Sequence, residues 1–188
     1  MDQHSFSTAF EKRLKPRIAA DLGLFALGQR FNVDYVTPWG NLVELKIRKL
    51  SEEKNGHGFV MNKRQYGKIK ERYLNGQTFF GRDGSCCLPK FSYLLLGYSS
   101  QSRVRSIGAV DEVIKDMNIS NVFLMDHRFI AEHDKSSKES RFYRVSVEDL
   151  DKSIRNKKEV CLLNSRIDLK LAADGKYVSE HCNFDSYL

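Results

Sequence analysis

The sequence predicts a mixed α/β (α+β) fold in which helices flank a central sheet. Apolar residues recur at helical spacing near the N-terminus, two strand-like segments follow, and a continuous apolar run lies near the middle of the chain. This mixture is typical of a sheet covered by helices. Because 188 residues are enough for one well-buried core, we expect a single domain over residues 1–188. Hydrophobic residues make up 41 % and charged residues 29 % of the chain, the proportions of a globular protein.

The first helix is predicted over residues 7–24. Its apolar side chains recur at every fourth position, which places them on one face. These side chains belong to Phe10, Leu14, Ile18 and Leu22. Pro16 lies inside this segment and is expected to shorten or kink the helix, because proline lacks the backbone N–H that an interior position donates.

Two strands are predicted over residues 30–36 and 41–49, joined by a turn at residues 37–40. Neighbouring residues on a strand point to opposite faces, so each segment divides into an apolar and a polar face. The apolar face is formed by Phe31, Val33, Tyr35, Val43, Leu45 and Ile47. The polar face is formed by Asn32, Asp34, Glu44, Lys46 and Arg48. If the segments pair as a hairpin, both apolar faces meet the core together.

Further elements are predicted along the rest of the chain. Residues 62–74 are expected to form a strongly basic helix, and the continuous apolar run at residues 91–98 a central buried strand. Ser146 and Asp149 have the spacing of a capping box, which predicts a helix through Ile154. Loops are predicted at residues 51–58 and 75–90, a short helix at 111–117, and strands at 121–130 and 142–147.

The polar face of the two early strands brings together two carboxylates and a lysine. Hard divalent cations such as Mg²⁺ prefer oxygen ligands and commonly sit on one or two carboxylates together with water and substrate phosphate. Asp34 and Glu44 are therefore predicted to hold the ion. Lys46 is predicted to orient the attacking water or to offset the charge that develops in the transition state.

This pattern resembles the signature of the PD-(D/E)XK nuclease superfamily: Asp34 is followed, after nine residues, by Glu44-Leu45-Lys46. The predicted order of elements agrees, with a leading helix, a hairpin that bears the acid and the ExK strand, a basic helix and an apolar strand. Val33 stands where the family motif has proline. The resemblance implies a restriction-endonuclease-like fold, a central mixed sheet flanked by helices, with its core at about 7–130 and a C-terminal elaboration at 135–188.

The resemblance also implies Mg²⁺-dependent hydrolysis of phosphodiester bonds, usually in DNA, with Mn²⁺ replacing Mg²⁺. The chain is small and its C-terminal half is rich in predicted short strands, so among these relatives it is most similar to a type II restriction endonuclease. Such an enzyme, as a homodimer, would cut both strands of a duplex. A Holliday-junction-resolving enzyme or an RNA-cleaving nuclease of the same fold is the alternative.

Many relatives carry a glutamate on the first helix, and the resemblance assigns that catalytic role to Glu11. Its alternative role is structural, because Thr8 and Glu11 have the spacing of a capping box at a helix start. Gln65 lies in the basic helix, but without the Gln-x-x-x-Tyr pattern of one large subgroup of the superfamily.

A positive patch surrounds the motif. The segment from Lys46 to Arg72 contains nine basic and three acidic residues, in a chain of net charge +7. Such a patch suits a polyanion, because neutralising phosphates releases counterions. The residues expected to contact nucleic acid are Arg48, Lys49, His57, Lys63, Arg64, Lys68, Lys70 and Arg72.

The alternative for these charges is a solvated face. The protein would then be a non-catalytic nucleic-acid-binding or regulatory protein, or a protein-interaction domain with no affinity for nucleic acid. Two further strings resemble ExK, Glu52-Glu53-Lys54 and Asp168-Leu169-Lys170, but neither has an upstream acid on a turn-linked strand.

Cysteine usage and hydropathy indicate the compartment. The four cysteines have neither CxxC spacing nor the density of a disulfide scaffold, which favours a reducing cytoplasm and no structural zinc. The apolar runs are too short to span a bilayer, and the N-terminus does not have the pattern of a signal peptide. We therefore expect a cytoplasmic protein with no membrane partner.

Overall fold

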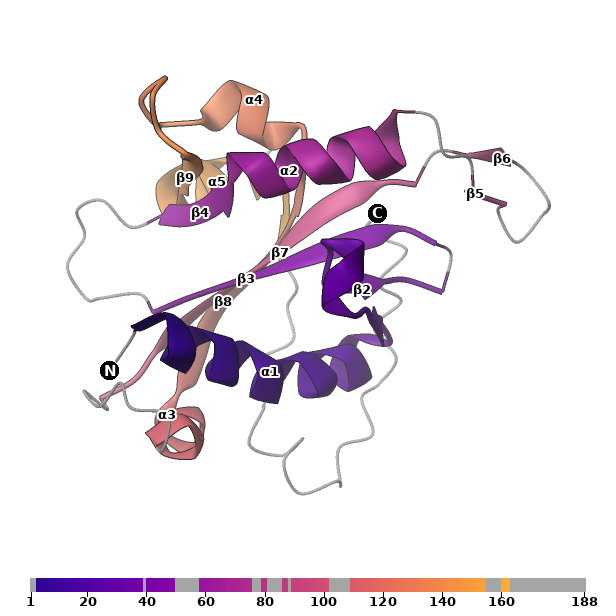
Figure 1. Cartoon of the computed structure of the whole chain (residues 1–188). Helices are drawn as coiled ribbons and strands as arrows, with labels where there is room; N and C mark the ends of the chain where they lie inside the picture. The colour runs from indigo at the N-terminus through magenta and orange to yellow at the C-terminus, as the bar shows by residue number, and fades with distance from the viewer. Residues whose placement is uncertain are drawn as a thin grey trace.

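A mixed sheet with helices on both faces forms the body of the protein (Figure 1). The computed structural model describes residues 3–38, 40–49, 58–75, 79–80, 86–87, 89–101, 109–154 and 160–162. Six strands follow the order β1-β2-β3-β7-β8-β10. They are β1 (Phe25–Ala26), β2 (Tyr35–Val36), β3 (Leu42–Lys49), β7 (Phe91–Ser99), β8 (Asn118–Asp126) and β10 (Val160–Leu162).

Two smaller strand pairs and the helices complete the described structure. The pairs are β4 (Gly58–Asn62) with β9 (Phe142–Ser146), and β5 (Phe79–Phe80) with β6 (Cys86–Cys87). The helices are α1 (Gln3–Leu22), α2 (Lys63–Ile69), α3 (Val110–Asp116), α4 (Phe129–His133) and α5 (Val147–Ile154). A 3₁₀ turn, η1 (Gln29–Phe31), precedes β2, and a π-helical turn, η2 (Lys70–Leu74), continues α2.

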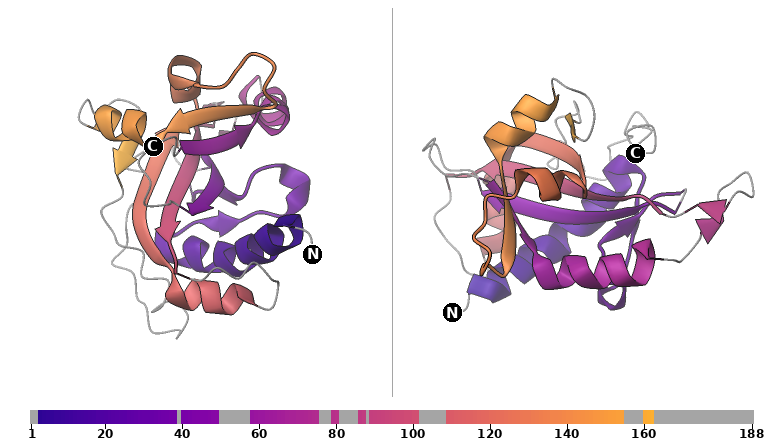
Figure 2. Two further views of the ribbon diagram at one scale, coloured as in Figure 1. Left: turned by 90° about the vertical axis from the view of Figure 1, so that its left-hand side faces the viewer. Right: turned by 90° about the horizontal axis from the view of Figure 1, so that it is seen from above.

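The sheet is mixed because β3 runs parallel to β7 while its other pairings are antiparallel. A parallel neighbour requires a crossover, and α2 lies in the chain between β3 and β7. Figure 1 shows α1 and α3 below the strands and α2 above them, and the left view of Figure 2 shows the same separation. The predicted fold class, a mixed α/β sheet flanked by helices, is confirmed.

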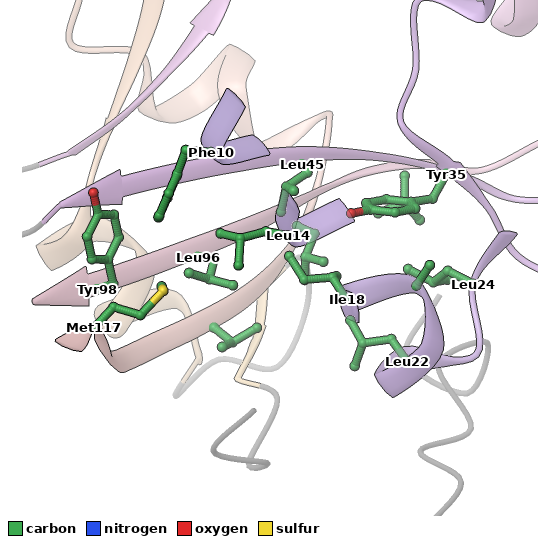
Figure 3. Close-up of a cluster of buried hydrophobic side chains, with 14 of the residues drawn as sticks. Phe10, Leu14, Ile18, Leu22, Leu24, Tyr35, Leu45, Leu96, Tyr98 and Met117 are labelled. Carbon is green, nitrogen blue, oxygen red and sulfur yellow. The ribbon is translucent and has the colours of Figure 1, made fainter. Parts of the chain in front are cut away.

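The core between α1 and the sheet contains the predicted helical stripe. Phe10, Leu14, Ile18 and Leu22 are all buried there, against residues of β3, β7 and α3 (Figure 3). The helix begins at Gln3, earlier than predicted, and continues through Pro16, which lies on its exposed side. It ends where Gly23 adopts φ +65° and the Leu24 N–H bonds back to the Ala19 carbonyl, a left-handed cap that suits glycine.

A second core fills the space between the sheet and α2. Its buried members include Leu42, Phe91, Tyr93 and Leu95 on the sheet and Ile69 on α2. Because both faces of the sheet are covered, all residues from Phe91 to Tyr98 are buried, as the continuous apolar run predicted.

The strand predicted at residues 30–36 is wrong over most of its length. Residues Gln29–Phe31 form η1, and Asn32 adopts a left-handed φ of 59°, so only Tyr35 and Val36 pair with β3. The physical reason is that carbonyls of this turn accept hydrogen bonds from side chains of α2 and η2 instead of from a strand. The donors are Gln65 to Asn32, Arg72 to Arg30 and Tyr73 to Phe31, at 2.9–3.2 Å.

Other boundaries differ less. The strand predicted at residues 121–130 begins at Asn118 and ends at Asp126, and α4 follows it. Gly58, assigned to a loop, begins β4; the rest of that loop, residues 51–57, lies outside the described residues. The basic helix is confirmed, with the Asn62 side chain accepting hydrogen bonds from the N–H groups of its first turn.

The later elements agree with the sequence. The predicted helix at residues 111–117 is α3, and the predicted strand at 142–147 is β9. The predicted helix through Ile154 is α5, and Ser146 caps its start: the Ser146 hydroxyl accepts from the Asp149 N–H at 3.1 Å and donates to the Asp149 carboxylate at 2.6 Å. Within the described residues, no helix is long and apolar enough to cross a membrane.

Candidate active site

Glu44 and Lys46 project from β3 on the face of the sheet that α2 covers. Val43 and Leu45 lie in the core on the α1 side, so alternation along the strand sends Glu44 and Lys46 to the other side. Their contacts with Gln65 of α2 agree with this placement. The alternation predicted from the sequence is confirmed for this strand.

Asp34 reaches the same site from the chain just before β2. Its Oδ2 accepts a hydrogen bond from the Leu45 N–H at 2.8 Å. The pairing of β2 with β3 begins at Tyr35, opposite Val43, so the Asp34 side chain satisfies a β3 amide beyond the end of the short strand. This bond fixes Asp34 beside the residue that follows Glu44, near enough for its charge to raise the pKa of Glu44.

Glu44 is a buried carboxylate with one satisfied oxygen. Only 2 % of the residue is exposed. Its Oε1 accepts from Lys46 Nζ and from Gln65 Nε2, both at 2.6 Å, whereas Oε2 is buried and no donor among the described residues reaches it. Burial raises the pKa of Glu44 to about 7, and the charge of Asp34 adds to the rise, while Lys46 opposes it.

Gln65 joins three parts of the site and was not predicted as a site residue. Its amide nitrogen donates to Glu44 and to the Asn32 carbonyl, at 2.6 and 3.2 Å, and its oxygen accepts from Lys46 at 3.4 Å. A signal for it exists in the sequence, because Gln65 lies four residues before Ile69 and eight before Tyr73. Both are buried, so Gln65 shares the inward face of the basic helix.

Lys15 of α1 is a second residue that the sequence analysis missed. Its ammonium forms an ion pair with Asp34 Oδ1, and neither side chain is more than a quarter exposed. The Lys15 carbonyl accepts from the Tyr35 hydroxyl at 3.2 Å. In Figure 3 this hydroxyl points towards α1. The sequence offers little signal for the pair, because Lys15 is one of several basic residues on the helix.

Glu11 lies on the exposed side of α1, one turn before Lys15. Burial raises the pKa of the Tyr35 hydroxyl, and the charges of Asp34, Glu11 and Glu44 raise it further, so Glu11 belongs to the electrostatic surroundings of the site. The capping-box alternative for Glu11 is wrong, because α1 begins at Gln3 and Thr8 lies inside it.

The basic residues predicted for nucleic acid fall into two groups. Arg64, Lys68 and Lys70 are exposed along α2 and η2, and Lys49 is exposed at the end of β3. These four side chains are exposed to solvent. His57 lies outside the described residues.

The other three basic residues have contacts within the protein. Arg48 donates to the Gly58 carbonyl, and burial and the nearby Arg144 lower its pKa. Arg72 lies over the rings of Phe31 and Tyr73 as well as bonding to the η1 turn. Lys63 lies over the ring of Tyr143, with its ammonium 5.0 Å from the ring centroid.

Two histidines near the end of β8 and in α4, His127 and His133, have aromatic or hydrogen-bonding partners. His127 Nδ1 lies 2.8 Å from the Tyr66 hydroxyl, and burial lowers the pKa of His127. His133 stacks on Phe129, with ring centroids 3.9 Å apart. Each ring therefore has a packing role in the described structure.

The donor set at Asp34 and Glu44 fits a hard divalent cation. Both residues offer carboxylate oxygens, and Glu44 Oε2 is a buried acceptor to which no described residue donates. Among the described residues, no group of three or more His, Cys, Asp and Glu side chains is arranged to hold a metal. Two carboxylates are sufficient for Mg²⁺ when water and substrate phosphate complete its coordination.

Comparison with known proteins assigns no family to the chain. No protein-family model matches the sequence, and no curated protein matches it significantly.

Proposed function

We propose that the protein is a divalent-metal-dependent nuclease that hydrolyses phosphodiester bonds of DNA. Asp34 and Glu44 would hold Mg²⁺, or Mn²⁺ in its place, and Lys46 would serve the attacking water. The observation that carries the proposal is the buried Glu44, whose Oε2 has no donor in the described part of the chain, together with the partners of its acid group, Lys46 and the charge of Asp34. A buried carboxylate is costly unless it is paired and fully hydrogen-bonded, so a half-satisfied one is typical of a functional site.

The order of elements supports the same proposal. The resemblance to PD-(D/E)XK nucleases implied a leading helix, a hairpin with the acid and the ExK strand, a basic helix and an apolar strand. The corresponding elements are α1, β2 with β3, α2 and β7. The exposed basic side chains of α2 lie on the same side of the sheet as Glu44 and offer contacts to the phosphates flanking a scissile bond.

The proposed chemistry assigns a task to each side chain. A bound Mg²⁺ would polarise the scissile phosphate and lower the pKa of a coordinated water. Lys46, held by Glu44 and Gln65, would hydrogen-bond the water whose oxygen attacks phosphorus as the bond to the leaving oxygen breaks. Its ammonium would also offset negative charge on the phosphate oxygens in the transition state. Gln65 would keep Glu44 and Lys46 in place.

A type II restriction endonuclease is the subclass that we propose, acting as a homodimer so that two sites cut the two strands of a duplex. A junction-resolving or RNA-cleaving enzyme would use the same site on another substrate. Because these subclasses share the chemistry, the form of the substrate distinguishes them.

One observation favours a second candidate, a non-catalytic nucleic-acid-binding protein. Each carboxylate of the site has a lysine partner, Lys15 for Asp34 and Lys46 for Glu44. Such pairs hold a protein together without any metal. Binding by this protein would fall steeply with salt whether or not Mg²⁺ is present, and the nucleic acid would stay intact.

A cleavage assay with matched variants tests the proposal. Supercoiled plasmid, branched DNA and single-stranded RNA are incubated with the purified chain in Mg²⁺ or in EDTA. Asp34→Asn and Lys46→Ala should each lower the rate about a hundred-fold or more. Asp111→Asn is the matched control, because Asp111 of α3 is also paired with a cation of α1, Arg13, but in a pair whose side chains are both more than half exposed.

The products decide between the candidates. Mg²⁺-dependent cutting that both site variants lose and the control retains supports the nuclease; discrete DNA fragments then indicate sequence specificity, and cutting of branched DNA alone indicates junction resolution. Full activity in Asp34→Asn would place the site elsewhere. Intact substrates under every divalent metal, with binding that persists in EDTA, would establish the binding protein.

A further inference from the structure

In the absence of metal, two lysines from different elements pair with the acidic side chains of the site. Lys46 of β3 pairs with Glu44, and Lys15 of α1 pairs with Asp34. Each acidic side chain of the site therefore has an ammonium partner. The pairing of Lys46 follows from the ExK pattern, whereas the pairing of Lys15 arises only because α1 packs beside β2.

Lys15 is held in this position by the core. The residues Leu14 and Ile18, on either side of it in α1, are fully buried. Its carbonyl accepts from the hydroxyl of Tyr35, the residue that follows Asp34, and Tyr35 is also fully buried. The Lys15–Asp34 pair is thus tied to the packing of α1 on β2, unlike the Arg13–Asp111 pair, in which both side chains are more than half exposed.

Both oxygens of Asp34 are engaged in this state. Oδ1 is in contact with the Lys15 ammonium, and Oδ2 accepts from the Leu45 N–H. A divalent cation bound by Asp34 would approach the oxygen that Lys15 contacts, or would lie beside its ammonium. Like charges at this separation oppose each other strongly at a partly buried site, where water screens them little.

We infer that Lys15 is a positioning residue that holds Asp34 in the absence of metal and weakens the affinity of the site for divalent cations. The inference rests on the proposed function, in which Asp34 is a metal ligand. The Lys15 ammonium competes with a divalent cation for Asp34. A bound ion must either displace the ammonium from Asp34 or bind beside it against charge repulsion. The negative charge of a nucleic-acid phosphate compensates that repulsion, so metal binds more tightly with substrate than alone.

The affinity of the full chain for Mn²⁺ alone, without nucleic acid, tests the inference. Free Mn²⁺ is measured by electron paramagnetic resonance during a titration of metal-free protein. Lys15→Gln removes the charge and keeps a polar group beside Asp34, and it should lower the Kd for Mn²⁺ at least about ten-fold. Lys15→Met removes the charge in a second way, so the test remains if one variant does not fold.

Two controls separate charge from structure. Lys15→Arg keeps the charge and should bind Mn²⁺ like the wild type. Lys12→Gln removes the same charge from an exposed position one turn earlier on the same helix, and should also leave the affinity unchanged. Adding Asp34→Asn to Lys15→Gln should abolish the gain, because the ion would lose a ligand.

Each outcome decides the matter. A gain restricted to the two charge-removing variants and dependent on Asp34 supports the inference, even if the wild type binds too little Mn²⁺ to measure. A gain shared by Lys15→Arg or Lys12→Gln, or an unchanged Kd in Lys15→Gln, overturns it. If the inference about Lys15 fails but the wild type binds Mn²⁺ through Asp34 and cleaves DNA, the proposed nuclease activity still stands. If neither the wild type nor the variants bind Mn²⁺, both proposals fail.

Discussion

Replacing Glu44 with glutamine should change how the stability of the metal-free protein depends on pH. The folded chain keeps the Glu44 proton up to about pH 7, because burial disfavours the carboxylate, whereas the unfolded chain releases it near the ordinary value of 4.5. Between these pH values the unfolded state binds fewer protons than the folded state. The free energy of unfolding of the wild type therefore falls as pH rises through this window, and levels off above it.

The size of the effect follows from the two pKa values. Each pKa unit corresponds to about 1.4 kcal/mol. A rise from 4.5 to about 7 therefore lowers the stability by up to about 3 kcal/mol across the whole window, of which about 2 to 3 kcal/mol falls between pH 5 and pH 8. Glutamine resembles the protonated acid and does not titrate, so Glu44→Gln lacks this loss.

Urea denaturation in EDTA at pH 5 and pH 8 measures the effect. The stability of Glu44→Gln relative to the wild type should increase by about 2 to 3 kcal/mol between the two pH values. Comparison of variants cancels the titration of the histidines, and Glu132→Gln, an exposed site on α4, should show no such change. A Glu44→Gln difference that is equal at both pH values would refute the argument that burial keeps this carboxyl protonated.

Three further substitutions test the surroundings of the site. Gln65→Ala should lower Mg²⁺-dependent cleavage about 10- to 100-fold, because Glu44 and Lys46 lose a shared partner, while Gln29→Ala, at an exposed position, should cleave normally; equal rates would contradict a role for Gln65. Gly58→Ala should lower the free energy of unfolding by about 1–3 kcal/mol, because a Cβ would collide with the Val145 carbonyl across the β4–β9 pair. Gly67→Ala, in α2 with open space around it, should instead raise the free energy of unfolding by up to about 1 kcal/mol. Both changes are measured by urea denaturation. A Gly58→Ala variant more stable than the wild type would be inconsistent with the close pairing of β4 and β9.

The orientation of Glu44 and Lys46 could be predicted because the signal is local. From Val43 to Arg48 in β3, apolar residues alternate with polar ones, and only one register buries Val43 and Leu45 against α1. The helical stripe from Phe10 is local in the same way. In these two segments the local pattern of side chains determines which face is buried, and sequence and structure agree.

The conformation of the residues just before Asp34 could not be predicted from the local sequence. Its alternating pattern favoured a strand, but Asn32 adopts the left-handed conformation and the turn is held by side chains from α2 and η2. Asp34 nevertheless reaches the site, because its side chain, rather than a strand backbone, bonds to Leu45. The spacing between Asp34 and Glu44 was therefore more informative than the predicted secondary structure.

Gln65 and Lys15 were missed for a related reason. Their partners lie 21 and 19 residues away in the chain, and the contacts exist only once α2 crosses over the sheet and α1 packs beside β2. The spacing of Gln65 from Ile69 and Tyr73 indicates only that it faces inward, and a single lysine among several on α1 carries no signal of its partner. Placing these helices on the sheet is what adds the two residues to the site.

Anomalous diffraction from crystals of the full chain soaked in Mn²⁺ tests most directly the central claim that Asp34 and Glu44 hold a divalent cation. We predict an anomalous peak within coordination distance, about 2.0–2.3 Å, of a carboxylate oxygen of each residue. The peak should be absent from Asp34→Asn crystals treated in the same way. A peak elsewhere in the molecule, or none at this site in a protein that cleaves DNA with Mn²⁺, would contradict the claim.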